Sequence, residues 1–374
     1  MDADGCTRRR FSIGVGAVSI AGIAGCAATD SQPKSGVTGS RTYRLNLART
    51  GAALEVDVPT PPWQEAWSLG SDARFRTSPA IVDGVVYVAS DFTLFAIDAA
   101  DGAEVWRQEF QTTTLSSPAV VGGRVYLGSG NRVYAFDRQT GTKEWEYSTV
   151  GSVFASPAVT DGTLYVGSTD NHLYAIDADS GKREWKFETD GSVGTPAVGD
   201  DTVYAGSEDA VLYAVDAGSG TEDWSFETAG PISSPPALDG EALYVTSRGK
   251  ALYRVDMSTG EPTLEIETNS ELYSAPAIAN GTVYFVDQRL HAVDAADGST
   301  DWTTDRKYLT APVVTDAGIL VSGVNQETID LIDPSDGTRE TSYPVDSQIV
   351  THPSVSDGTI VVSSWDEVSS LEQL

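Results

Sequence analysis

This 374-residue chain contains only two cysteines, Cys6 and Cys26, and both lie near its start. If the first 25 residues are removed, as argued below, Cys26 alone remains, which excludes an internal disulfide and a cysteine-based metal site. The three histidines, His172, His291 and His352, are far apart and show no metal-ligand spacing. A glycine-rich phosphate loop and a nucleophile elbow are also missing, so no motif announces a catalytic chemistry.

Basic residues are scarce as well. The chain has 24 lysines and arginines against 54 acidic residues, a formal net charge of −30. Without a basic patch to neutralise phosphates, a nucleic-acid partner is excluded. Repulsion within such a surface strains a compact fold in dilute buffer, but molar salt shortens the screening length to about 3 Å. The composition therefore favours a halophilic protein, and the alternative is a surface that binds cations or basic partners.

Beyond residue 40 no amphipathic helical pattern persists for three turns. A gapless motif, Asp-x3-Gly-x3-Trp, recurs instead at intervals of about 40 residues. Its complete copies are Asp98, Gly102 and Trp106; Asp137, Gly141 and Trp145; Asp177, Gly181 and Trp185; Asp216, Gly220 and Trp224; and Asp294, Gly298 and Trp302. Copies at Asp256 and Asp333 lack the tryptophan. Because all seven aspartates stand at the same position of the unit and none is distinguished, we assign them to turns and not to an acid/base or metal array.

A proline column shows that there are eight units. Its members are Pro79, Pro118, Pro157, Pro196, Pro235, Pro276, Pro312 and Pro353. The units contain two runs of alternating apolar residues, such as TLYVGS from Thr163, and a fourth short segment that in the best copies reads Trp-x-aromatic, as in Trp145-Glu146-Tyr147. Four short strands at this period are typical of a propeller blade. We predict an all-β fold, an eight-bladed β-propeller of four-stranded antiparallel blades, with a solenoid as the alternative.

The two ends of the repeat region complement each other. The eighth unit stops at Leu374 without an Asp-Gly-Trp turn, whereas Trp67 stands 12 residues before Pro79, the spacing of Trp106 from Pro118. We therefore predict that an N-terminal strand at Trp67–Leu69 completes the last blade and closes the ring.

The first forty residues indicate export. Three arginines, Arg8 to Arg10, precede a short apolar stretch that ends at Ile23-Ala24-Gly25-Cys26. Twin arginines before an apolar run too short to span a bilayer mark the twin-arginine export route. The ending resembles a lipobox, which would make Cys26 the lipidated first residue; otherwise Cys26 is an ordinary small residue of a signal peptide. We expect a signal peptide at 1–25, a lipidated tether at 26–40, a lead-in segment at 41–63 and the propeller at 64–374.

One further column suggests a binding surface. The residues three positions before each proline are Arg76, Leu115, Phe154, Val193, Ile232, Tyr273, Leu309 and Val350. Seven of these eight are apolar. They are candidates for a collar at one mouth of the central channel that docks a peptide or partner loop. The alternative is that they form the core between blades.

The repeat SPAVTDGTLYVGSTDNHLYAIDADSGKREWKFET, from Ser156, resembles the tryptophan-docking repeat of pyrroloquinoline-quinone-type propellers. The resemblance extends from about residue 64 to the end. That superfamily includes quinoprotein dehydrogenases, the BamB lipoproteins and cell-surface proteins of salt-loving archaea, and the last group is the most similar. The dehydrogenases hold their quinone against adjacent disulfide-bonded cysteines, beside a calcium or related ion and an aspartate base. This chain has no adjacent cysteine pair.

These observations favour a monomeric, non-catalytic scaffold without cofactor or metal. It would be anchored by Cys26 to the outer face of the cytoplasmic membrane, where it binds unidentified protein partners. The alternative is a quinoprotein-like oxidoreductase or a small-ligand sensor.

Overall fold

The computed structural model describes residues 51–54, 56–323, 327–349, 351–356 and 358–374. All belong to one compact unit, Val37–Leu374. The predicted signal peptide, the lipidation site Cys26 and the tether lie outside these residues. The described ranges contain 33 strands and no helix. Among them, accordingly, no helix has the length and apolar character needed to cross a bilayer.

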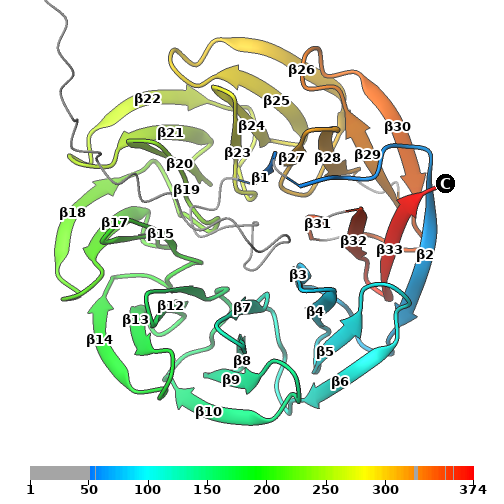
Figure 1. Cartoon of the computed structure of the whole chain (residues 1–374). Coiled ribbons are helices and arrows are strands. Elements are labelled where there is room, and N and C mark those ends of the chain that lie inside the picture. The colour runs from blue at the N-terminus through cyan, green and yellow to red at the C-terminus, as the bar shows by residue number, and fades with distance from the viewer. Residues whose placement is uncertain (1–50, 55, 324–326, 350, 357) are drawn as a thin grey trace, which may run out of the picture. The chain divides into compact units, whose positions relative to one another are not determined.

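Eight sheets follow one another around a ring (Figure 1), which confirms the predicted eight-bladed all-β propeller. Blade 1 consists of β3 (Ala80–Val82), β4 (Val85–Ala89), β5 (Thr93–Asp98) and β6 (Glu104–Glu109), and blade 2 of β7 (Ala119–Val121), β8 (Arg124–Ser129), β9 (Arg132–Asp137) and β10 (Lys143–Ser148). Blade 3 consists of β11 (Ala158–Thr160), β12 (Thr163–Ser168), β13 (His172–Asp177) and β14 (Arg183–Glu188), and blade 4 of β15 (Ala197–Gly199), β16 (Thr202–Gly206), β17 (Val211–Asp216) and β18 (Glu222–Glu227). Blade 5 consists of β19 (Ala237–Asp239), β20 (Ala242–Ser247), β21 (Ala251–Asp256) and β22 (Pro262–Glu267), and blade 6 of β23 (Ala277–Ala279), β24 (Thr282–Val286), β25 (Arg289–Asp294) and β26 (Thr300–Lys307). Blade 7 consists of β27 (Val313–Thr315), β28 (Gly318–Ser322), β29 (Thr328–Ile332) and β30 (Arg339–Pro344). Within each blade, neighbouring strands are antiparallel, as the alternating sequence predicts.

The last blade joins the two ends of the described chain. It consists of β31 (Ser354–Ser356), β32 (Thr359–Ser363), β33 (Glu367–Gln373) and, on its outer edge, β2 (Trp63–Gly70). Strand β2 pairs antiparallel with β33, with Trp67 opposite Ser370, and runs along it in Figure 1. The predicted closure by an N-terminal strand is therefore confirmed. A short strand, β1 (Ala52–Ala53), adds to blade 7 by pairing parallel with β27.

The tryptophans of the repeat lock each blade onto the next. The Trp145 ring in blade 2 covers Gly181 of blade 3, and its indole Nε1 donates a hydrogen bond to the Ala178 carbonyl, 3.0 Å away. A β-carbon on Gly181 would lie 2.7 Å from the Trp145 ring, so only glycine allows this approach. Trp67, Trp106, Trp185, Trp224 and Trp302 make the same indole hydrogen bond across their own boundaries.

Two departures from the tryptophan column have structural explanations. Leu264 occupies the tryptophan position of blade 5 and packs over Gly298, so the apolar contact persists without an indole hydrogen bond. Thr341 of blade 7 faces blade 8, where the third and fourth strands, β33 and β2, come from opposite ends of the chain. No Asp-x3-Gly turn connects them, so a tryptophan at position 341 would have no glycine on which to dock.

The repeated aspartates lie in turns. The Asp177 carbonyl accepts the Gly181 N–H at 2.9 Å, and its carboxylate accepts the Ser180 N–H at 2.7 Å. The carbonyl bond recurs in all seven copies, and carboxylate bonds from the turn backbone accompany it. The Ser180 hydroxyl and N–H bonds lower the pKa of Asp177. The same local hydrogen bonds in all seven copies account for the motif as a turn element.

Candidate functional site

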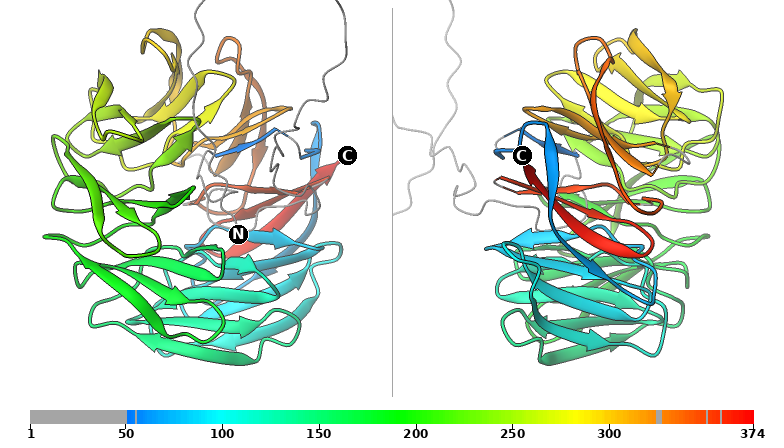
Figure 2. Two further views of the ribbon diagram at one scale, coloured as in Figure 1. Left: turned by 60° about the vertical axis from the view of Figure 1, so that its left-hand side comes forward. Right: turned by 90° about the vertical axis from the view of Figure 1, so that its right-hand side faces the viewer.

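The ring has two different faces, seen from the side in Figure 2. One, here called the loop face, consists of the hairpins between the second and third strands and the loops that lead into the next blade. These pack together in register: the Thr169 N–H donates to the Ser152 carbonyl, and the Arg248 N–H donates to the Pro231 carbonyl, both at 2.9 Å. The other, the turn face, carries the Asp turns and the first hairpins, which the Ala178 N–H bond to the Gly162 carbonyl connects.

Large apolar side chains are exposed mainly on the loop face. The exposed side chains there are Val150 (90%), Tyr273 (62%), Phe154 (46%), Phe92 (45%) and Leu309 (44%). Among the described residues, the other large apolar side chains with comparable exposure are Leu54, Val105 and Leu374. Exposed aromatic and aliphatic groups gathered on one face are characteristic of interaction sites.

The structure distributes the predicted collar unevenly. Arg76, Phe154, Tyr273 and Leu309 are exposed on the loop face, and Leu115 is half-buried. Val193 and Ile232, in contrast, are 5% and 1% exposed and belong to the core. Val350 lies outside the described residues.

A one-residue difference in the loops explains the buried members. Val193 forms an isolated β-bridge with Ser207, as Phe75 does with Ser90, although Phe75 stands four residues before its proline and Val193 only three. In blades 4 and 5, the position that Phe154 fills on the loop face of blade 3 is therefore filled by Gly194 and Ser233. The apolar collar is thus discontinuous, with small residues on that side of the ring.

Charged residues that the sequence analysis did not single out accompany Tyr273. The Cζ atom of Arg248 lies 5.4 Å from the centre of the Tyr273 ring. Its Nη1 lies 3.3 Å from Glu208 Oε2, and its Nε lies 3.6 Å from Glu271 Oε2. The Tyr273 hydroxyl donates to Glu271, which raises the pKa of the tyrosine and lowers that of the carboxyl. In blade 1, Arg76 Nε lies 3.2 Å from Asp91 Oδ1. Arg248 could have been noticed as the one basic residue in a slot where blades 3 and 4 have Thr169 and Glu208.

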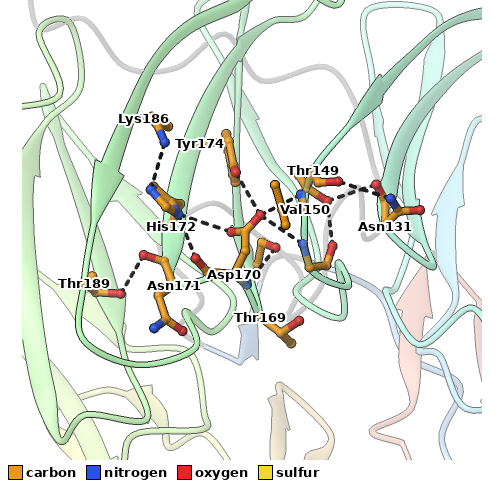
Figure 3. Close-up of polar contacts among 12 residues, drawn as sticks. Asn131, Thr149, Val150, Thr169, Asp170, Asn171, His172, Tyr174, Lys186 and Thr189 are labelled. Atoms are coloured by element: carbon orange, nitrogen blue, oxygen red, sulfur yellow. Dashed lines mark hydrogen bonds and ion pairs between the residues drawn. The ribbon is translucent and has the colours of Figure 1, made fainter.

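The Asp170 side chain holds the loop that presents Val150 and Phe154 (Figure 3). Its Oδ2 accepts the Val150 N–H at 2.8 Å, the Gly151 N–H at 3.1 Å and the Tyr174 hydroxyl at 2.9 Å. Burial opposes ionisation of Asp170, but these hydrogen bonds outweigh it and keep the pKa of its carboxyl below the ordinary value. Asp170 thus fixes the backbone from which Val150 and Phe154 project.

We expect Asp170→Asn to lower the free energy of unfolding at pH 7 by about 1–3 kcal/mol, the cost of disturbing a buried acceptor. Because the folded pKa of Asp170 is depressed, its stabilisation is present above the unfolded pKa of about 3.9 and is lost as pH falls through the folded value. The difference between wild type and variant should therefore shrink below about pH 4. Urea unfolding at pH 7, 5 and 3 measures it, with the exposed Asp161→Asn as control. An equal difference at all three pH values would contradict the assignment.

The divergence of blade 7 has a structural basis too. Asp330, which replaces a strand tyrosine, is fully buried, with Arg306 Nε 3.1 Å away and the Ser342 hydroxyl donating at 2.6 Å. The Tyr308 hydroxyl also donates to Asp330, and burial together with this carboxylate raises the pKa of Tyr308. A buried carboxylate needs such partners, and here they come from two adjoining blades. This cluster is a structural replacement for the missing aromatic contact.

A quinone and its metal, held as in the dehydrogenases, would need adjacent cysteines and a cluster of metal-binding side chains. No group of three or more His, Cys, Asp or Glu side chains among the described residues could hold a metal ion. The full sequence has no adjacent cysteines, since its two cysteines are residues 6 and 26. These residues therefore do not fit the cofactor arrangement of the dehydrogenases.

Fold and repeat chemistry together define the class: a β-propeller whose blades are joined by docked tryptophans. The family described as outer membrane protein assembly factor BamB matches residues 59–159, 149–233 and 208–323, and the chain belongs to that family. No curated protein matches the sequence.

Solved structures agree on the fold. BamB from Moraxella catarrhalis is 18% identical, with 83% of this chain and 99% of that one covered and a TM-score of 0.74. The quinohemoprotein alcohol dehydrogenase from Comamonas testosteroni is 14% identical, with 89% and 80% covered and a TM-score of 0.79. A europium-containing methanol dehydrogenase is 12% identical, with 90% and 98% covered and a TM-score of 0.77. At such identities these matches establish the fold alone.

Proposed function

We propose that this propeller is a non-catalytic interaction scaffold that binds a protein partner through its loop face. The observation that carries the proposal is the concentration of exposed Phe92, Val150, Phe154, Tyr273 and Leu309 on that face. The family name, which describes an assembly factor, is consistent with protein partners. A rigid ring suits this role because its loops are already ordered before the partner arrives, which reduces the entropic cost of binding.

The chemistry of the face constrains the partner. Phe154 and Tyr273 offer aromatic anchors, while Arg76 and Arg248 provide cations that carboxylates of the protein itself already engage. A partner segment with apolar side chains for the aromatic residues, flanked by groups that exchange with these ion pairs, fits best.

The proposed scaffold role includes a location outside the cell. We place the protein outside the cell, exported by the twin-arginine route and held at the membrane by a lipid on Cys26, as a monomer in a high-salt environment. The net charge of −30 and the sequence of residues 7–26 support this setting.

The test uses the double variant Phe154→Asp/Tyr273→Asp. Both side chains are exposed, so the free energy of unfolding should change by no more than about 1 kcal/mol. Loss of two aromatic anchors should reduce partner co-purification from solubilised membranes at least about tenfold. Val105→Asp is the matched control, since Val105 is 49% exposed at the turn-face end of β6. Undiminished co-purification with the double variant would refute the assigned face.

An oxidoreductase remains the second candidate because two dehydrogenases share the fold. An absorbance spectrum of protein purified from its native membrane distinguishes the two. A quinone chromophore that co-purifies in stoichiometric amount would favour the oxidoreductase and contradict the scaffold.

A further inference from the structure

A cavity of about 600 Å³ opens at the loop-face end of blade 6. Arg289 and His291 of β25, Thr303 and Lys307 of β26, and Ser270 of the preceding loop contribute to its lining. Its volume lies in the range of small-ligand sites, about 300–1,000 Å³. Neither the tryptophan docking nor the proposed partner surface uses these residues.

Two irregularities of blade 6 lie at the cavity. The turn between β24 and β25 is short, and Gln288 within it has a φ of 93°, which a non-glycine side chain rarely adopts. Strand β26 also bulges: Arg289 lies opposite Lys307 and His291 opposite Thr303, so four steps along β26 match two along β25. A bulge bends the strand and redirects side chains, and such bulges are common next to functional sites.

The residues that line this cavity differ in charge from the residues at the equivalent positions of the other blades. The slot of Lys307 contains a glutamate in blades 1, 3, 4 and 5, namely Glu109, Glu188, Glu227 and Glu267. In blade 2 the corresponding Arg132 has Glu146 at 3.8 Å, but blade 6 has Thr303 in the place of Glu146. Arg289 and Lys307 are therefore directly opposed like charges, an arrangement that costs stability. Within the described part of the chain neither forms an ion pair.

The remaining lining groups are held in place. The one carboxylate of the lining, Asp287, is 7% exposed and bonded through Oδ1 to His291 Nε2 at 2.6 Å. His291 Nδ1 lies 2.9 Å from the Thr303 hydroxyl, and its ring stacks on Phe285. Lys307 donates to the Gln288 amide oxygen at 2.9 Å, and the Gln288 amide donates to the Ser270 hydroxyl at 3.0 Å. The two cations thus share the lining with hydrogen-bonding groups that are already ordered, and the Asp287 carboxylate among them is engaged by His291.

We propose that this cavity binds the phosphate monoester of a small sugar. The guanidinium of Arg289 and the ammonium of Lys307 match a doubly charged tetrahedral oxyanion, which would relieve their mutual repulsion. A phosphate group alone fills only a small part of the volume, and the hydroxyls of Ser270 and Thr303 with the Gln288 amide suit the ligand's hydroxyl groups. The site goes beyond the proposed scaffold role and does not depend on it.

The test is titration calorimetry of the full propeller with glucose 6-phosphate and ribose 5-phosphate, and separately with glucose and inorganic phosphate. At least one sugar phosphate should bind at least tenfold more tightly than both glucose and inorganic phosphate. Equal affinity for inorganic phosphate would overturn the sugar part of the proposal, equal affinity for glucose would overturn the anion part, and no binding would overturn both.

The decisive variant is Lys307→Glu, which restores the residue that four other blades carry in this slot and so should fold. It should weaken sugar-phosphate binding at least tenfold. Lys182→Glu makes the same charge change at an exposed turn-face position and should alter the Kd less than twofold. Circular dichroism confirms folding of both, and equal losses in the two variants would mean that only net charge matters, contradicting the site.

Discussion

Gly181→Ala should lower the free energy of unfolding by about 2–5 kcal/mol, whereas Gly162→Ala should cost only about 1–2 kcal/mol. Both glycines have positive φ, +69° and +82°, so both alanines suffer the same backbone penalty. At Gly181, however, the added β-carbon would meet the Trp145 ring at 2.7 Å, while at Gly162 nothing lies within 4 Å. The difference between the variants isolates the cost of displacing a docked tryptophan.

Urea unfolding followed by tryptophan fluorescence and circular dichroism measures both variants. A larger loss for Gly181→Ala, together with a change in the native-state tryptophan fluorescence that Gly162→Ala does not show, supports docking as the link between blades. Equal losses would mean that the ring yields without cost, and that the repeat motif serves the turn alone.

Trp67→Ala should have an effect of similar size, about 3–5 kcal/mol, since a large buried side chain is removed from the closure of the ring. Trp67 is 7% exposed, covers Gly102 and donates to the Ala99 carbonyl at 2.8 Å. It lies on β2, the strand that ties the N-terminal part of the propeller to its last blade. The matched control is Trp106→Ala, which breaks the same contact between blades 1 and 2.

Hydrogen exchange distinguishes the two tryptophan variants. Trp67→Ala should accelerate amide exchange first in β2 and β33, whereas Trp106→Ala should do so in β6 and the facing turn of blade 2. A loss below about 1 kcal/mol for Trp67→Ala, or unchanged exchange in β2, would contradict closure by this strand.

The architecture could be predicted because the residues that make each contact between blades recur at the same spacing in most of the repeats. Gly181 opposite Trp145 is one of many equivalent pairs, so period and spacing were sufficient for blade number and closure. Even the missing tryptophan at Thr341 follows once β2 is known to complete blade 8. Radial repetition turns a local sequence rule into a global fold.

The candidate surface was less predictable because counting residues from a proline does not determine which side chain enters the core. Val193 and Ile232 share the spacing of Phe154 but fill the buried position, since a one-residue shift exchanges inside for outside. The cavity of blade 6 was missed for a related reason. The cavity lies beside a short turn at Gln288 and a bulge between Arg289 and His291, and neither irregularity leaves a periodic signal.

The most direct test of the proposed function maps the contact surface in the native membrane. A photo-crosslinking amino acid is placed at Val150, Phe154 or Tyr273 on the loop face, and at Val105 at the turn-face end of β6, in the full chain. The interaction scaffold predicts one reproducible partner adduct from the loop-face positions and none from Val105. Adducts from Val105 alone, or equal adducts from both faces, would contradict it.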